Sequence, residues 1–88
     1  MEETKQDVPR DLGPQPVDQL LEELALTNRD LVAASPEQLT HKQVQRARKG
    51  RRLTRNMQQK VRKALLAAVA AQGIERNVER EELFNYRP

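Results

Sequence analysis

The side chains with the clearest chemical potential lie at residues 41–49, where amide and cationic groups share the polar face of an expected helix. A glutamine amide can pair with the edge of adenine, and a lysine or arginine cation can pair with the edge of guanine. The first turn of such a helix also has unpaired backbone N–H groups that can bind phosphate. These residue types indicate hydrogen bonding to a nucleic acid. The candidate side chains are His41, Lys42, Gln43, Gln45, Arg46 and Lys49.

The charge of the chain is strongly segregated. Residues 40–72 contain ten Lys or Arg and no Asp or Glu, whereas residues 1–39 contain nine Asp or Glu and three Lys or Arg. The formal net charge of +3 therefore hides a local positive field, whose most common natural partner is a phosphate backbone. Two alternatives stay open for the basic stretch. It could be a solvated helix face that keeps a small protein soluble, or a face that Asp18, Glu22 and Glu23 neutralise within the fold.

Composition favours one small helical domain without a reactive centre. The chain has 88 residues and only two aromatic ones, Phe84 and Tyr86, so its core must be built from Leu, Val, Ala and Met. There is no cysteine, and the single histidine, His41, fits a surface helix residue better than a metal ligand. No glycine-rich phosphate loop or triad-like spacing is visible, so we expect no enzyme activity, no cofactor and no metal.

The elements that position these side chains can be predicted from periodicity and caps. Residues 1–16 are polar and contain three prolines, which predicts a disordered leader. From Val17 to Leu24, apolar residues recur at i, i+3, i+4 and i+7, which predicts a first helix over about 17–25. No apolar run approaches the roughly 20 residues needed to cross a bilayer, so we expect no membrane partner.

Two short helices are expected next. Thr27 or Asn28 would cap the first of them, and Pro36 would end it because the residue before a proline avoids the helical region. Thr40 would cap the second, which would run over 41–49 and end at Gly50 in a left-handed C-cap. Its apolar positions, Val44 and Ala47, would face the core.

A longer helix follows and a short one is expected after it. Thr54 would cap a helix that runs to Ala71 or Gln72, with a single apolar stripe beginning at Met57. A short fifth helix is expected over about 75–84. Apolar residues near this end of the chain need cover, so we expect them to form a dimer interface. They are Ile74, Val78, Leu83, Phe84 and Tyr86.

From Thr27 to Leu65 the chain resembles the lambda-repressor-like (XRE/Cro-type) helix-turn-helix domains. In that family a Ser or Thr cap precedes the second helix, as in residues 27–32 here, and a hydrophobic residue and a second cap open the recognition helix. The recognition helix then contains an inward aliphatic residue and ends at a glycine. After it come a basic pair, another cap and an Ala-Leu pair in the next helix. The matching residues are Leu39, Thr40, Val44, Gly50, Arg51-Arg52, Thr54 and Ala64-Leu65. The connection at 35–38 is longer than the family's usual turn, and Arg48 stands where the family often has an acid.

The resemblance implies an all-α lambda-repressor-like helix-turn-helix fold of four to five helices, with the domain at 17–72 and an extension at 73–88. It implies sequence-selective binding of double-stranded DNA by a small bacterial transcription regulator, cytoplasmic and nucleoid-associated, with 41–49 as recognition helix. Such domains read two half-sites one helical turn apart, so a homodimer is a candidate assembly. By this resemblance, phosphates are contacted by Asn28 and Thr40. Base edges are faced by Lys42, Gln43 and Arg46, with His41 and Gln45 beside them. The DNA backbone near the start of the next helix is followed by Arg51, Arg52 and Arg55.

The same residues also allow simpler roles. Glutamines are common on exposed helices, so Gln43 needs no base-reading role, and Arg51 and Arg52 could simply compensate the C-terminal dipole of the preceding helix. In a different class of function, the basic face would dock an acidic partner protein in a protein-interaction adaptor. RNA is a third candidate, but the basic stretch lacks the aromatic residues on which single-stranded bases stack.

Overall fold

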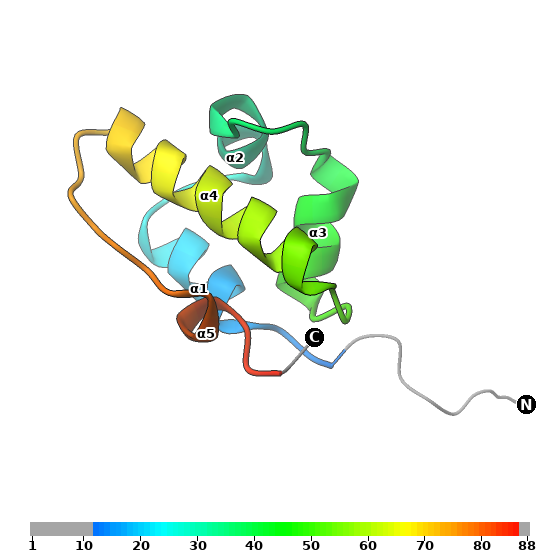
Figure 1. The fold of residues 1–88 in the computed structure, drawn as a ribbon. Coiled ribbons are helices and arrows are strands. Elements are labelled where there is room, and N and C mark those ends of the chain that lie inside the picture. The colour runs from blue at the N-terminus through cyan, green and yellow to red at the C-terminus, as the bar shows by residue number, and fades with distance from the viewer. Residues whose placement is uncertain (1–11, 87–88) are drawn as a thin grey trace, which may run out of the picture.

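The fold consists of five helices in the part of the chain that the computed structural model describes, residues 12–86. Figure 1 shows α4 running across the molecule, with the shorter helices packed around it. These residues contain no β-strand, so the all-α class expected from the sequence is confirmed for them. The helices are α1 (Pro16–Glu23), α2 (Asn28–Ala34), α3 (His41–Lys49), α4 (Arg55–Ala71) and α5 (Arg80–Leu83).

Threonine caps begin the three helices that follow α1. The side chain of Thr27 accepts a hydrogen bond from the backbone N–H of Asp30, and that of Thr40 accepts one from Gln43. In both cases the third helical residue bonds back to the cap, which completes a capping box. Thr54 caps α4 through the backbone N–H of Met57. Because these bonds are local, the sequence predicted the starts of α2, α3 and α4 correctly.

Gly50 ends α3 in the left-handed conformation expected from the sequence, with φ at +98°. A side chain at this position would also collide with the carbonyl oxygen of Gly13. The chain therefore requires a glycine here for two reasons, the sign of φ and the close approach of a neighbouring segment.

Residues 12–15 lie against the end of α3. The backbone N–H of Leu12 donates to the carbonyl of Gly50 over 2.8 Å, and that of Gln15 donates to the carbonyl of Arg48 over 3.1 Å. The side chain of Gln15 is buried, and its oxygen accepts from the backbone N–H of Asn85 over 2.8 Å. We expected a disordered leader over 1–16. Its first part, residues 1–11, lies outside the described residues, whereas residues 12–15 belong to the fold.

The apolar stripe of α4 lies at the centre of the core. α4 packs against α2, α3 and α5, and α1 packs against α3 and α5. The buried side chains of α4 include Val61, Leu65 and Val69, which lie in one cluster with Leu21 and Leu31.

The residues expected to form a dimer interface are covered by this chain itself, which corrects that prediction. Val78, Leu83 and Phe84 are at most 3% exposed and belong to the core cluster, while Ile74 and Tyr86 are partly buried against it. The short α5 brings Leu83 into the core, although it spans only the later part of the range 75–84 expected for it. These apolar residues therefore need no second copy of the chain for cover.

Candidate nucleic-acid interface

α3 turns one face inward and the other outward. Val44 and Ala47 are fully buried and fix the helix to the core, as the sequence predicted. The opposite face leaves five of the predicted site residues exposed and Gln43 half-buried. The exposed ones are His41, Lys42, Gln45, Arg46 and Lys49.

Both amide side chains on this helix have their oxygen atoms engaged. The side-chain oxygen of Gln43 accepts the backbone N–H of Thr40 over 3.0 Å, as part of the capping box. The side-chain oxygen of Gln45 accepts a hydrogen bond of 3.0 Å from the Nδ2 atom of Asn28. Each glutamine therefore keeps its NH₂ group for contacts outside the fold, and Thr40 itself is exposed beside them.

Asn28 is engaged on both of its side-chain polar atoms. Its Nδ2 atom binds Gln45, and its Oδ1 atom accepts a hydrogen bond of 2.7 Å from Nη1 of Arg48. One N–H of the Asn28 amide remains for the phosphate contact that the sequence suggested. The main role that the structure gives this residue is to connect the start of α2 to α3.

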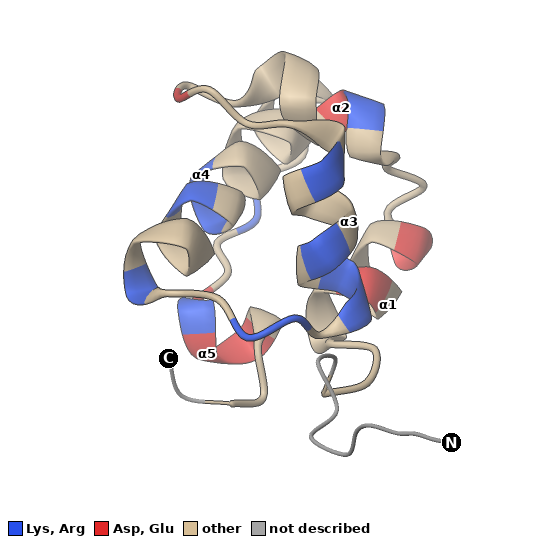
Figure 2. Ribbon diagram, turned by 90° about the vertical axis from the view of Figure 1, so that its right-hand side faces the viewer, with Lys and Arg blue, Asp and Glu red and all other residues tan. Residues whose placement is uncertain are grey.

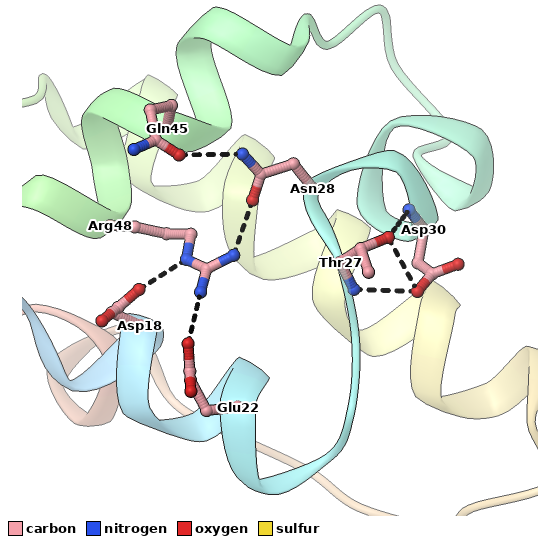
Figure 3. A network of polar contacts seen from close by, with 7 residues as sticks. All are labelled: Asp18, Glu22, Thr27, Asn28, Asp30, Gln45 and Arg48. Atoms are coloured by element: carbon pink, nitrogen blue, oxygen red, sulfur yellow. Dashed lines mark hydrogen bonds and ion pairs between the residues drawn. The ribbon is translucent and has the colours of Figure 1, made fainter.

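Arg48 is a residue whose importance the sequence did not reveal. Its guanidinium donates to Asp18, to Glu22 over 3.3 Å and to Asn28, so it joins α1, α2 and α3 (Figure 3). Its side chain is only 16% exposed. The hypothesis that acids of the first helix neutralise the basic stretch is thus correct for this one cation, through Asp18 and Glu22. A sequence signal was present, because these two acids stand one helical turn apart on the same helix.

Two cations of α4 also have acceptors within the fold. Arg62 donates to the carbonyl oxygen of Val78 over 2.6 Å and lies 3.8 Å from a carboxylate oxygen of Glu79. Lys63 pairs with Glu37, which belongs to the connection between α2 and α3, over 3.3 Å. These contacts hold the connections in place, so neither cation is the best candidate for an external ligand.

The remaining cations of α3 and the first half of α4 form the basic face, which we define as Lys42, Arg46, Lys49, Arg55 and Lys60. Figure 2 shows Lys and Arg along α3, on α4 and on the connection between them, with the Asp and Glu residues of α1 beside α3 and those of α5 below α4. Among residues 12–86, none of these five has an ion-pair or hydrogen-bond partner for its side chain. Their charges are therefore directed to solvent or to a ligand.

The connection between α3 and α4 is held by Tyr86, another residue that the sequence did not identify as important for the site. The Tyr86 hydroxyl accepts the backbone N–H of Leu53 over 2.8 Å and donates to the carbonyl of Arg51 over 2.9 Å. The guanidinium carbon of Arg52 lies 5.4 Å from the centre of the Tyr86 ring, within the range of a cation–π contact. The basic pair of the sequence therefore sits on a fixed backbone.

A shallow hollow of about 290 Å³ separates the outer face of α3 from the start of α4. Several predicted site residues come together at this hollow. The sequence could suggest that they lie close together only through the family resemblance. Its lining includes Gln43, Arg46, Arg51, Arg52, Thr54 and Met57. The hollow thus combines cationic and amide side chains with the apolar side chains of Leu53 and Met57.

No family model, curated protein or solved structure matches this chain significantly. Among the described residues, no helix combines the length and the apolar character that a bilayer crossing requires. The structure shows an all-helical fold for residues 12–86, and the XRE type is an expectation from the sequence resemblance.

Proposed function

We propose that this chain binds double-stranded DNA with sequence selectivity, as an XRE-like helix-turn-helix regulator of transcription, and that α3 is its recognition helix. The observation that carries the proposal is the basic face. It places five cations that have no ion-pair or hydrogen-bond partner among residues 12–86 beside two outward amide groups of α3. Phosphate neutralisation by such cations supplies affinity, and side chains on an exposed helix supply preference for a sequence.

The dimensions of α3 support a duplex ligand. An α-helix with its side chains is about 10–12 Å across, which fits a major groove about 12 Å wide, and the nine residues of α3 give about 13 Å of helix to lie in it. Single-stranded nucleic acids are usually bound by stacking on aromatic side chains. The stretch 40–72 has none, and the Tyr86 ring is occupied by its contacts with Arg52 and Phe84.

The experiment that tests this proposal is a fluorescence-anisotropy titration of a labelled random-sequence duplex across a salt series. We expect log K to fall linearly with log salt, with a slope of about 0.9 for each phosphate neutralised. A titration with polyglutamate under the same conditions separates the proposal from its alternative. An adaptor for acidic proteins would bind polyglutamate as well as it binds the duplex. Equal affinities, or no binding of the duplex at low salt, would contradict the DNA-binding proposal.

A further inference from the structure

The hydrogen bonds around Gln45 fix which of its two polar atoms faces outward. Arg48 has only donors, and its contacts with Asp18 and Glu22 hold it in place. The amide of Asn28 must therefore turn its oxygen toward Arg48, which leaves its NH₂ group to donate to the oxygen of Gln45. The direction of the first bond sets the direction of the next. Figure 3 shows the result, with the nitrogen of Gln45 pointing away from Asn28.

The side-chain nitrogen of Gln43 also faces outward, for a different reason. Its oxygen accepts the backbone N–H of Thr40, which has no other orientation to offer. The remaining charged side chains on the outer face of α3 are Lys42, Arg46 and Lys49, and lysine and arginine are donors only. Apart from His41, whose ring can donate or accept, the polar groups that α3 offers outward are hydrogen-bond donors.

We propose, as an inference that rests on the DNA-binding proposal, that this donor-only surface makes α3 select guanine, with Gln45 as a specificity-determining residue. In the major groove guanine offers two acceptors, N7 and O6, whereas adenine offers one acceptor and one donor. A glutamine that reads adenine must use its oxygen and its nitrogen together. The oxygens of Gln43 and Gln45 each accept a hydrogen bond within the fold, so the bidentate adenine contact that the sequence suggested would require the amide to give up or share that bond.

The substitution Asn28→Asp tests whether the hydrogen bond from Asn28 sets the orientation of the Gln45 amide and, through it, the preferred base. The introduced carboxylate has acceptors only, so it still accepts from Arg48 but cannot donate to Gln45. Gln45 must then turn its NH₂ group inward and its oxygen outward. Because the variant also loses one unit of positive net charge, Arg29→Ala is the matched control. Arg29 is exposed and adjacent, and its removal changes the net charge equally without touching the hydrogen-bonded chain.

The first measurement is selection from a random duplex library by the wild-type protein, followed by titration of paired duplexes that carry guanine or adenine at the enriched position. We expect wild type to prefer guanine by about tenfold or more. Replacing that guanine by 7-deazaguanine, which lacks the N7 acceptor, should reduce the preference. In Asn28→Asp the ratio of the affinity for the guanine duplex to the affinity for the adenine duplex should fall toward one, or reverse, at one base position of the site. Arg29→Ala should lower both affinities and leave their ratio unchanged.

An independent measurement needs no DNA. The side-chain amide resonances of Gln45, followed by NMR, should shift in Asn28→Asp because the NH₂ group gains an intramolecular acceptor. Two results would overturn the inference while leaving DNA binding intact. One is enrichment of adenine, cytosine or thymine by wild type. The other is an unchanged ratio of guanine to adenine affinity in Asn28→Asp although the NMR shift shows that the Gln45 amide has turned. Absence of any salt-dependent duplex binding by wild type would remove both proposals.

Discussion

The guanidinium of Arg48 lies 2.7 Å from the side-chain oxygen of Asn28, so the last turn of α3 is bonded to the first residue of α2. The same guanidinium neutralises Asp18 and Glu22 on α1. One side chain thus sets the position of three helices relative to one another. It belongs to the basic stretch of the sequence, yet its charge is used inside the fold.

We expect Arg48→Met to lower the free energy of unfolding by about 1–3 kcal/mol, because it removes charge-assisted hydrogen bonds and leaves two carboxylates without a counter-charge. Urea denaturation followed by circular dichroism measures this change. The matched control is Lys49→Met, since Lys49 is the next cation on the same helix and is exposed. Equal midpoints for the two variants would show that the Arg48 contacts do not contribute to stability.

Gly50→Ala should destabilise the protein more than Gly73→Ala. Both glycines have positive φ, which costs about 1–2 kcal/mol for alanine. The added methyl group at Gly50 would also collide with the carbonyl of Gly13, whereas at Gly73 it would meet open space. Thermal unfolding of both variants gives the comparison. The close approach of residues 12–15 to α3 would be contradicted if the two variants melted at the same temperature.

Tyr86→Phe should loosen the connection between α3 and α4 and leave the core intact. The substitution keeps the ring and removes the hydroxyl that bonds the backbone of Arg51 and Leu53. The expected loss of stability is about 1–2 kcal/mol, because two backbone groups lose their partner. Limited proteolysis after the arginines of this connection should become faster. Phe84→Leu, which alters the neighbouring ring without changing these bonds, serves as the comparison, and equal cleavage rates would argue against the role given to the hydroxyl.

Arg46→Ala should weaken duplex binding far more than Arg76→Ala, although both remove one positive charge. Arg46 belongs to the basic face, whereas Arg76 lies in the connection between α4 and α5 and lines a different hollow. A base contact by Arg46 would cost about 1–3 kcal/mol when lost, and a phosphate contact would reduce the salt slope by about 1. Anisotropy titrations at several salt concentrations distinguish these cases. Similar losses in both variants would mean that only net charge matters.

The helices of the central part of the chain could be predicted because their signals are local. Thr27, Thr40 and Thr54 each bond to a backbone group three residues away, and Gly50 ends α3 through its own φ. Such rules act within one helical turn, so the sequence alone contains them. The outward position of Lys42 and Arg46 follows from the same helical period once Val44 is placed in the core.

The contacts that shape the candidate site could not be predicted in this way, because they join distant residues. Arg48 meets Asp18 across 30 positions, and Tyr86 meets Leu53 across 33. Both depend on how the helices pack, which caps and periodicity do not specify. The expectation of a dimer interface failed for the same reason. Val78, Leu83 and Phe84 looked uncovered in the sequence, but α5 and its neighbouring segments fold back onto the core.

The bond between the side chain of Gln15 and the backbone of Asn85 joins segments 70 positions apart. Both segments also hold the end of α3, through the bond from Leu12 to Gly50 and the bonds of Tyr86 to the connection that follows. Closing so long a loop costs entropy, which is recovered only when these contacts form together. We therefore expect the two segments and the connection after α3 to open as one cooperative unit, so that the backbone amides of Leu12, Leu53 and Asn85 show the same free energy of opening in hydrogen exchange.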